Sequence, residues 1–104
     1  MEVYRSFRIH ASRHLPELAD GHICKKMHGH TFNITISCIG KINDKTGFII
    51  DFYDIDHVFN NYVHSKIDHK ILNDVEGLDN PTSENLAKWI WNTLHPHLSI
   101  LSKV

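Results

Sequence analysis

The sequence has little of several features that would assign it to a class at once. It contains no run of about 18 apolar residues, so it predicts no membrane-spanning helix. Its formal net charge is only −1, which gives no electrostatic case for binding nucleic acid or an anionic membrane. It also lacks low-complexity tracts, linkers and internal repeats. These absences leave a globular domain as the expectation.

The N-terminal decapeptide carries charge and has no apolar signal-peptide core, so we expect a cytoplasmic location. In that reducing compartment the only two cysteines, Cys24 and Cys38, are expected to be thiols rather than a disulfide. With 104 residues, of which 41% are hydrophobic, the chain can build one modest core. We therefore expect a single domain over residues 1–104.

Alternating apolar residues predict strands at residues 2–12 and 28–42. Between them, residues 13–27 hold few apolar anchors and predict a long loop, which in a small domain is usually functional. Turn-forming residues at 43–47 are followed by the apolar Phe48-Ile49-Ile50, which predicts a third strand and a hairpin.

After these strands the apolar period becomes helical. Residues 53–66 predict one amphipathic helix, and a second begins near Pro81, with Thr82 as N-cap, and ends at Pro96. The last residues, 98–104, could begin a further strand. The order of elements predicts an α+β domain whose two helices cover one face of an antiparallel sheet.

Two histidines stand where the second strand begins. Strand parity puts His28 and His30 on the same covered face as Phe32, with their side chains rooted roughly 7 Å apart. Two imidazoles at that spacing can reach one metal ion, and this is the interpretation we favour. The alternative is that one histidine packs while the other donates to a backbone carbonyl.

A zinc site would need a third ligand, for which the candidates are His10, His14, His22 and Cys24. Cys24 can equally be an ordinary thiol, whereas Cys38 belongs to an apolar stripe and predicts a core residue. Asp68-His69 follows the first helix. A carboxylate beside an imidazole can form an acid–base pair, although such a pair can also simply cap a helix end.

Four short motifs, in order, resemble a known family. They are Cys24-x-x-x-His28-Gly29-His30, Gly47 to Phe52, Asp68-His69 with Leu72-Asn73, and Asn80 to Glu84. Together they are similar to the 6-pyruvoyltetrahydropterin synthase family over nearly the whole chain. The three residues between Cys24 and His-Gly-His most resemble the bacterial 6-carboxytetrahydropterin synthases of queuosine precursor biosynthesis, whereas a longer gap would resemble the animal pyruvoyl enzymes.

The resemblance implies a T-fold assembled as a homo-oligomer, a hexamer in the family, with active sites between subunits. It implies a small pterin substrate, 7,8-dihydroneopterin triphosphate, a bound Zn²⁺, and release of triphosphate and acetaldehyde. By the same resemblance Cys24 would be the thiolate base, His69 oriented by Asp68 would be the partner acid–base, and Thr82 and Ser83 would contact the pterin.

The chain departs from the family pattern at the third zinc ligand. In the run Ala11-Ser12-Arg13-His14-Leu15-Pro16 the histidine comes one place late, and Arg13 stands in the ligand position. Strand parity likewise points Arg13 inward and His14 outward, so a β-bulge near residues 11–13 would be needed to turn His14 inward. With that bulge, His14, His28 and His30 are the expected zinc ligands.

A second departure concerns the closing strand, in which family members carry a glutamate that anchors the pterin. We expect that strand to be missing, because no such segment follows residue 104. Two alternatives to the carboxy-forming zinc lyase therefore stay open. One is the pyruvoyl-forming synthase, and the other is a truncated, non-catalytic zinc-binding T-fold module.

Overall fold

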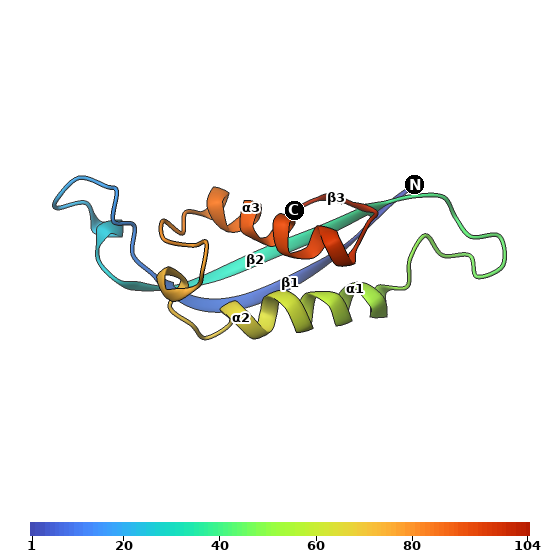
Figure 1. Cartoon of the computed structure of the whole chain (residues 1–104), viewed down its shortest axis with the longest axis horizontal. Coiled ribbons are helices and arrows are strands. Elements are labelled where there is room, and N and C mark those ends of the chain that lie inside the picture. The colour runs from blue at the N-terminus through green and yellow to red at the C-terminus, as the bar shows by residue number, and fades with distance from the viewer.

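A computed structural model describes residues 1–104 and contains one three-stranded antiparallel sheet, in the order β1-β2-β3 (Figure 1). The strands are β1 (Glu2–Arg13), β2 (His28–Ile39) and the short β3 (Leu101–Lys103). The molecule is elongated, with principal extents of 57 × 21 × 20 Å. Its length follows the two long strands, which form a ribbon that carries the rest of the chain.

The ribbon pairs β1 with β2 in one uninterrupted register. Glu2 lies opposite Ile39 at one end and Arg13 lies opposite His28 at the other. Because side chains alternate between faces, the odd residues of β1 and the even residues of β2 share the inner face, as the sequence predicts. Ile9 and Ile36, both fully buried, belong to this face.

The first helical segment runs without a break from Phe52 to Ile67. It consists of α1 (Phe52–Phe59), a π-helical turn η2 (Asn60–His64) and α2 (Ser65–Ile67). Asp51 caps its start by accepting a hydrogen bond from the amide of Tyr53 at 2.9 Å. The predicted helix at 53–66 is thus confirmed, with a π turn that periodicity does not reveal.

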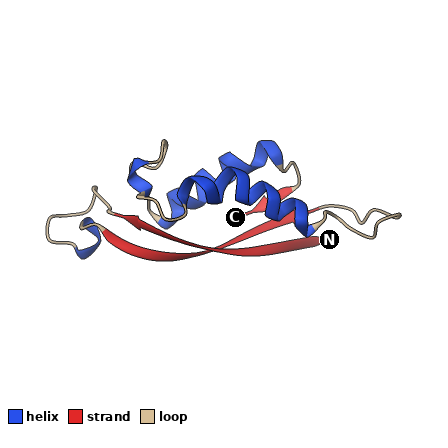
Figure 2. Ribbon diagram, turned by 90° about the horizontal axis from the view of Figure 1, so that it is seen from below, coloured by secondary structure: helices blue, strands red, loops and turns tan.

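The second long helix is α3 (Ser83–Leu94), followed by the 3₁₀ turn η4 (His95–His97). Thr82 is its N-cap, as predicted, and accepts from the amide of Asn85 at 3.1 Å. Figure 2 shows that both long helical segments lie on the same side of the sheet, while its other side is uncovered. A cluster of 17 buried apolar residues fills the space between sheet and helices.

The predicted third strand at residues 48–50 is wrong. Asn43 closes a local turn instead: its amide donates to the carbonyl of Phe48 at 2.7 Å, and its side chain accepts from the amides of Lys45 and Thr46. These local hydrogen bonds take the place of a strand ladder, and Phe48 is half exposed. The segment projects beyond the end of the sheet (Figure 1), and β3 is the strand that pairs with β2.

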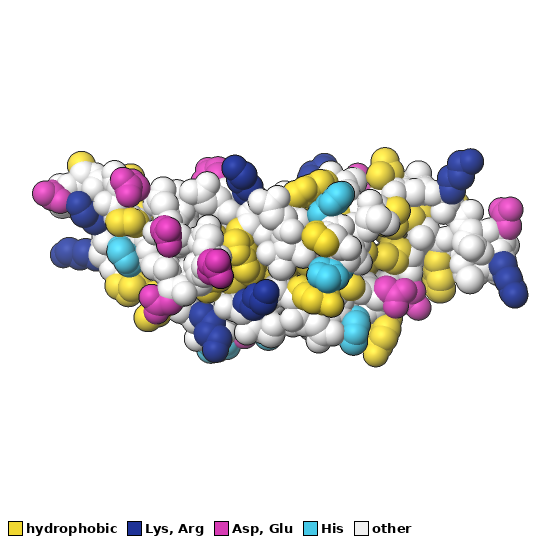
Figure 3. Space-filling model, viewed as in Figure 1, with side chains coloured by type: hydrophobic (Ala, Val, Ile, Leu, Met, Phe, Trp, Pro, Cys, Tyr) yellow, Lys and Arg dark blue, Asp and Glu magenta, His cyan; other side chains and the backbone are white.

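Charged side chains of both signs are interspersed along the molecule, and Figure 3 shows no large patch of one sign on the face it presents. None of the helices combines the length and the apolar character that crossing a membrane would require.

The packing of Phe59 yields a test of the core. This fully buried side chain stacks on Phe7 of β1, with ring centroids 3.9 Å apart. We expect Phe59→Ala to lower the free energy of unfolding by about 3–5 kcal/mol, because it removes buried apolar contacts and leaves a cavity. Urea titration measures this. The control Phe48→Ala, in the loop that replaces the predicted strand, should change stability little, and an equal loss there would contradict the assignment of that loop.

Candidate functional site

The pair Asp68-His69 is held against the outer edge of β1. The chain leaves α2 at Ile67 and then runs beside the strand: the amide of His69 donates to the carbonyl of His10 at 2.6 Å, and the amide of Ser12 donates to the carbonyl of Lys70 at 2.9 Å. A parallel bridge joins Ser12 to Ile71. Backbone pairing therefore fixes the position of the carboxylate and the imidazole.

Asp68 accepts hydrogen bonds on both of its carboxylate oxygens. The amide of His10 donates to Oδ1 at 3.0 Å, and His69 Nδ1 lies 2.7 Å from Oδ2. Since a carboxylate only accepts, His69 Nδ1 carries the hydrogen, and Nε2 is the nitrogen left to exchange a proton. The Asp68 side chain is 16% exposed, whereas that of His69 is 76% exposed. This is the geometry of a positioned acid–base imidazole.

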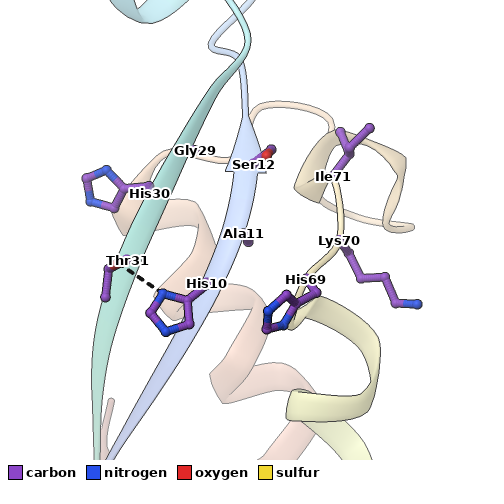
Figure 4. Close-up of a pocket in the computed structure, with 9 residues that line it drawn as sticks. All are labelled: His10, Ala11, Ser12, Gly29, His30, Thr31, His69, Lys70 and Ile71. Atoms are coloured by element: carbon purple, nitrogen blue, oxygen red, sulfur yellow. Dashed lines mark hydrogen bonds between the residues drawn. The ribbon is translucent and has the colours of Figure 1, made fainter.

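His69 is the only non-glycine residue with a positive φ, at 57°. This left-handed conformation is sparsely populated, and such residues gather at functional sites. Figure 4 shows the rings of His69 and His10 next to each other beside β1, in an edge-to-face arrangement with centroids 5.9 Å apart. They line a cavity of about 440 Å³, in which His10 also bonds the hydroxyl of Thr31 at 3.0 Å.

The surroundings of Asp68 hold its pKa below the usual carboxyl value. The largest cause is the hydrogen bond from the amide of His10, which favours the charged form. Partial burial opposes this, and the hydrogen bond and charge of His69, with a smaller contribution from His64, act in the same direction as the amide. Asp68 is therefore ionised at neutral pH and can orient His69.

His28 and His30 lie together at the other side of the ribbon. They share its inner face, and their ring centroids are 6.5 Å apart. His28 Nδ1 donates to the carbonyl of Lys26 at 2.8 Å, while the ring of His30 packs on Phe32 with centroids 4.6 Å apart. These contacts are those of the alternative interpretation, in which one histidine donates to a carbonyl and the other packs. They leave His28 Nε2 free.

The structure does not bring a third ligand to these two histidines. The β1–β2 register contains no bulge, so Arg13 points inward, as parity predicts, and only 8% of it is exposed. His14 follows the end of β1, where its amide and carbonyl are both bonded to the side chain of Asn73. No group of three or more His, Cys, Asp or Glu residues in the chain could hold a metal ion. The zinc set of His14, His28 and His30 stays a prediction.

The remaining predicted site residues lie apart from the Asp68-His69 pair. Cys24 is a free thiol in the 3₁₀ turn η1 (Ile23–Lys25), and its amide and carbonyl bond His22 and Leu15 in the same loop. Thr82 and Ser83 begin α3. The side chains of His10 and Thr31 are on the outer face of the ribbon and those of His28 and His30 on the inner one, although His30 also lines the cavity beside His69.

Sequence reasoning missed two neighbours of Asp68. His64 Nε2 lies 3.3 Å from Asp68 Oδ2, and the i,i+4 spacing of these residues on a helix could have revealed that contact. His10 was considered only as a metal ligand, yet its amide binds Asp68 and its ring faces His69. No local signal in the sequence indicates that contact, because 58 residues separate His10 from Asp68.

The lowered pKa of Asp68 predicts a pH-dependent stability. A carboxyl group whose pKa is lower in the folded than in the unfolded chain stabilises the fold above about pH 4, and this contribution is lost as the pH falls through the folded value. Asp68→Asn should therefore be less stable than the parent at pH 7, and the gap should narrow at pH 3. Urea unfolding at both pH values tests this, with the exposed Asp44→Asn as the control. A difference in free energy of unfolding between parent and Asp68→Asn that grows toward pH 3 would contradict a lowered pKa of Asp68 as its cause.

A family model described as 6-pyruvoyl tetrahydropterin synthase matches residues 2–104. A 6-carboxy-5,6,7,8-tetrahydropterin synthase of Bacillus subtilis is 31% identical over 106 residues, covering 96% of this chain and 69% of the relative. A protein of the same name from Synechocystis is 32% identical over 96 residues, covering 88% of this chain and 73% of the relative.

The fold agrees with these similarities. The structure of Caenorhabditis elegans 6-pyruvoyl tetrahydropterin synthase superposes with a TM-score of 0.87 at 23% identity, covering 97% of this chain and 83% of that one. This confirms the predicted T-fold, in which the sheet of one chain is not closed. The match over residues 2–104, the two relatives and the shared fold lead to one conclusion. The chain belongs to the 6-pyruvoyl tetrahydropterin synthase family.

Proposed function

We propose that the protein is a 6-carboxy-5,6,7,8-tetrahydropterin synthase. It would convert 7,8-dihydroneopterin triphosphate with release of triphosphate and acetaldehyde, in queuosine precursor biosynthesis. The relatives from Bacillus and Synechocystis carry this name, and the spacing of Cys24 from His28 favours the same branch. The observation that carries the proposal is the Asp68–His69 hydrogen bond of 2.7 Å, which leaves an exposed imidazole nitrogen free to transfer a proton.

In this proposal each residue has a distinct task. Asp68 holds the imidazole of His69 in one tautomer, so that Nε2 takes up or gives back a proton of the substrate side chain. The thiol of Cys24 acts as the second proton-transferring group. Ser83 and the backbone around Thr82 contact the pterin ring at the start of α3, since the hydroxyl of Thr82 is already engaged as the N-cap.

A homo-oligomer would complete the site. One chain keeps Asp68-His69 at the outer edge of β1 and His28, His30 and Ser83 on the inner side of the ribbon. A neighbouring copy that brings its Asp68-His69 pair to the inner side would place all of these groups around one substrate. The need for a second copy therefore follows from the proposed chemistry, and the hexamer follows from the family resemblance.

The second candidate function is a non-catalytic pterin-binding module of the same fold. The specific observation in its favour is that Cys24, in the turn η1, lies apart from the Asp68-His69 pair, so one chain does not bring the two proposed proton-transfer groups together. The pyruvoyl-forming activity is the third outcome to separate, because the matching family model carries that name.

Turnover distinguishes the three. The protein is incubated with 7,8-dihydroneopterin triphosphate, and acetaldehyde and pterin products are followed by chromatography. Acetaldehyde together with 6-carboxy-5,6,7,8-tetrahydropterin is the expected result, and Cys24→Ala and His69→Ala should each lower the rate about 10²–10⁴-fold by removing a proton-transfer group.

The control variant is His57→Ala, an exposed imidazole on α1 that bonds only Asn61, and it should keep the parent rate. A pyruvoyl product without acetaldehyde would replace the proposal with the pyruvoyl activity. Pterin binding without any product would favour the non-catalytic module.

A further inference from the structure

Arg13 is an unusual residue for the inner face of the ribbon. It lies opposite His28, is 8% exposed, and sits at the end of the β1 stripe that continues through Ala11 and Ile9. Its guanidinium lies over the ring of Phe32, with Cζ 5.0 Å from the ring centroid. The ring of His30 packs on the same Phe32. The guanidinium and the imidazole therefore share one aromatic support.

The positive charge of Arg13 has no counter-ion in the chain. Nη1 donates to the carbonyl of Pro81 at 3.0 Å and lies 3.5 Å from the hydroxyl of Ser83, while Nε is buried without any partner. By contrast Arg5, on the same face of the same strand, is held by both carboxylate oxygens of Asp56, at 2.9 and 2.7 Å. A buried charge without a counter-charge is costly, so Arg13 indicates a binding partner that the chain itself does not supply.

A cavity adjoins this group. It has a volume of about 360 Å³ and is lined on one side by His30 and Phe32 and on the other by Ser83 and α3. The imidazole of His30 and the hydroxyl of Ser83 line this space, and the guanidinium of Arg13 lies beside two of the lining residues, Ser83 and Phe32. A planar guanidinium matches the two oxygens of a carboxylate in a bidentate pair, which is the strongest form of this interaction.

The same observations disfavour a divalent metal at His28 and His30. The chain offers no third ligand to them, and the group that stands opposite His28 is itself cationic. A dication held by these histidines would be repelled by a neighbouring guanidinium that has no counter-ion. The residues on this face therefore do not fit a zinc ion.

We propose that Arg13 makes this an anion-binding site, in which its guanidinium holds the carboxylate of a 6-carboxypterin in place of a metal. This rests on the proposed function, because it names the part of the pterin that Arg13 binds. Two measurements test it, one of metal and one of ligand, and the first does not depend on any activity.

The metal arm uses zinc alone. Parent protein, Arg13→His, and Arg13→His combined with His28→Ala are equilibrated with excess zinc, gel-filtered, and analysed by mass spectrometry. Residue 13 lies directly opposite His28 and diagonally from His30, so Arg13→His would complete three imidazoles on one face and bind about one zinc per chain. The parent and the double variant should retain none.

One zinc per parent chain, lost in His14→Ala, would overturn the proposal in favour of the three-histidine set. Failure of Arg13→His to bind zinc would contradict the placement of residue 13 beside His28 and His30, on which the proposal rests.

The ligand arm uses the fluorescence of 6-carboxypterin and of pterin without the carboxylate. The parent should bind 6-carboxypterin more tightly, and Arg13→Gln should weaken that binding about tenfold or more while leaving binding of unsubstituted pterin unchanged. Arg13→Lys keeps the positive charge but not the bidentate geometry of the guanidinium, so it should recover part of the affinity for 6-carboxypterin. It also controls for a loss of binding that comes from misfolding. Arg8→Gln, at an exposed arginine on the outer face of β1, is the matched control.

The outcomes separate the two proposals. If the parent and Arg13→Gln bind 6-carboxypterin with the same affinity, the role of Arg13 is overturned and the pterin function stands. Binding of neither pterin by the parent would overturn the proposed function, and with it the carboxylate contact, whatever the zinc measurement gives.

Discussion

The twelve residues of β1 pair with the twelve of β2 without a bulge or slip, from Glu2 opposite Ile39 to Arg13 opposite His28. Because strand side chains alternate, this one register decides which face every residue of the ribbon occupies. It buries the apolar stripes under the helices, and it also puts Arg13, His28 and His30 side by side where the stripes end. A shift of this register by one residue would move the apolar side chains of one strand out of the core and would separate Arg13 from His28 and His30.

The outer edge of β1 carries the other half of the candidate site. The π turn η2 and α2 end where Asp68 accepts the amide of His10, and His69 adopts a left-handed conformation to continue along the strand. The imidazole is thereby presented to solvent, and its partner carboxylate stays bonded on both oxygens. A single chain thus presents the side chains of these two sets of polar groups on opposite faces of the ribbon, which is why the proposed function calls for a second copy.

Much of this could be predicted from the sequence because it depends on local periodicity. Patterns within a few residues predict the two long strands, both helices and the N-cap Thr82. The alternation of strand side chains also predicted correctly that Arg13 faces inward. The supposed strand at residues 48–50 failed because Asn43 satisfies that backbone through a turn. The contact of His10 with Asp68 could not be predicted either, since it depends on how distant segments pair.

The family could also be predicted from the sequence, because its motifs are local. His28-Gly29-His30 and Asp68-His69 are local motifs, so the family could be recognised before the fold was seen. The consequence of Arg13 was not accessible, because an arginine in a strand is ordinarily a solvated or paired residue. Only its burial, its lack of a carboxylate partner and its place opposite His28 give it a meaning.

The register at the end of the ribbon is the claim on which the account depends most, and nuclear Overhauser contacts between backbone protons of the two strands measure it directly. The account predicts cross-strand contacts that join Arg13 to His28 and Ala11 to His30. Contacts that instead join His14 to His28 would reveal a bulge that turns Arg13 away from this face. That result would contradict the anion site and restore the three histidines as metal ligands.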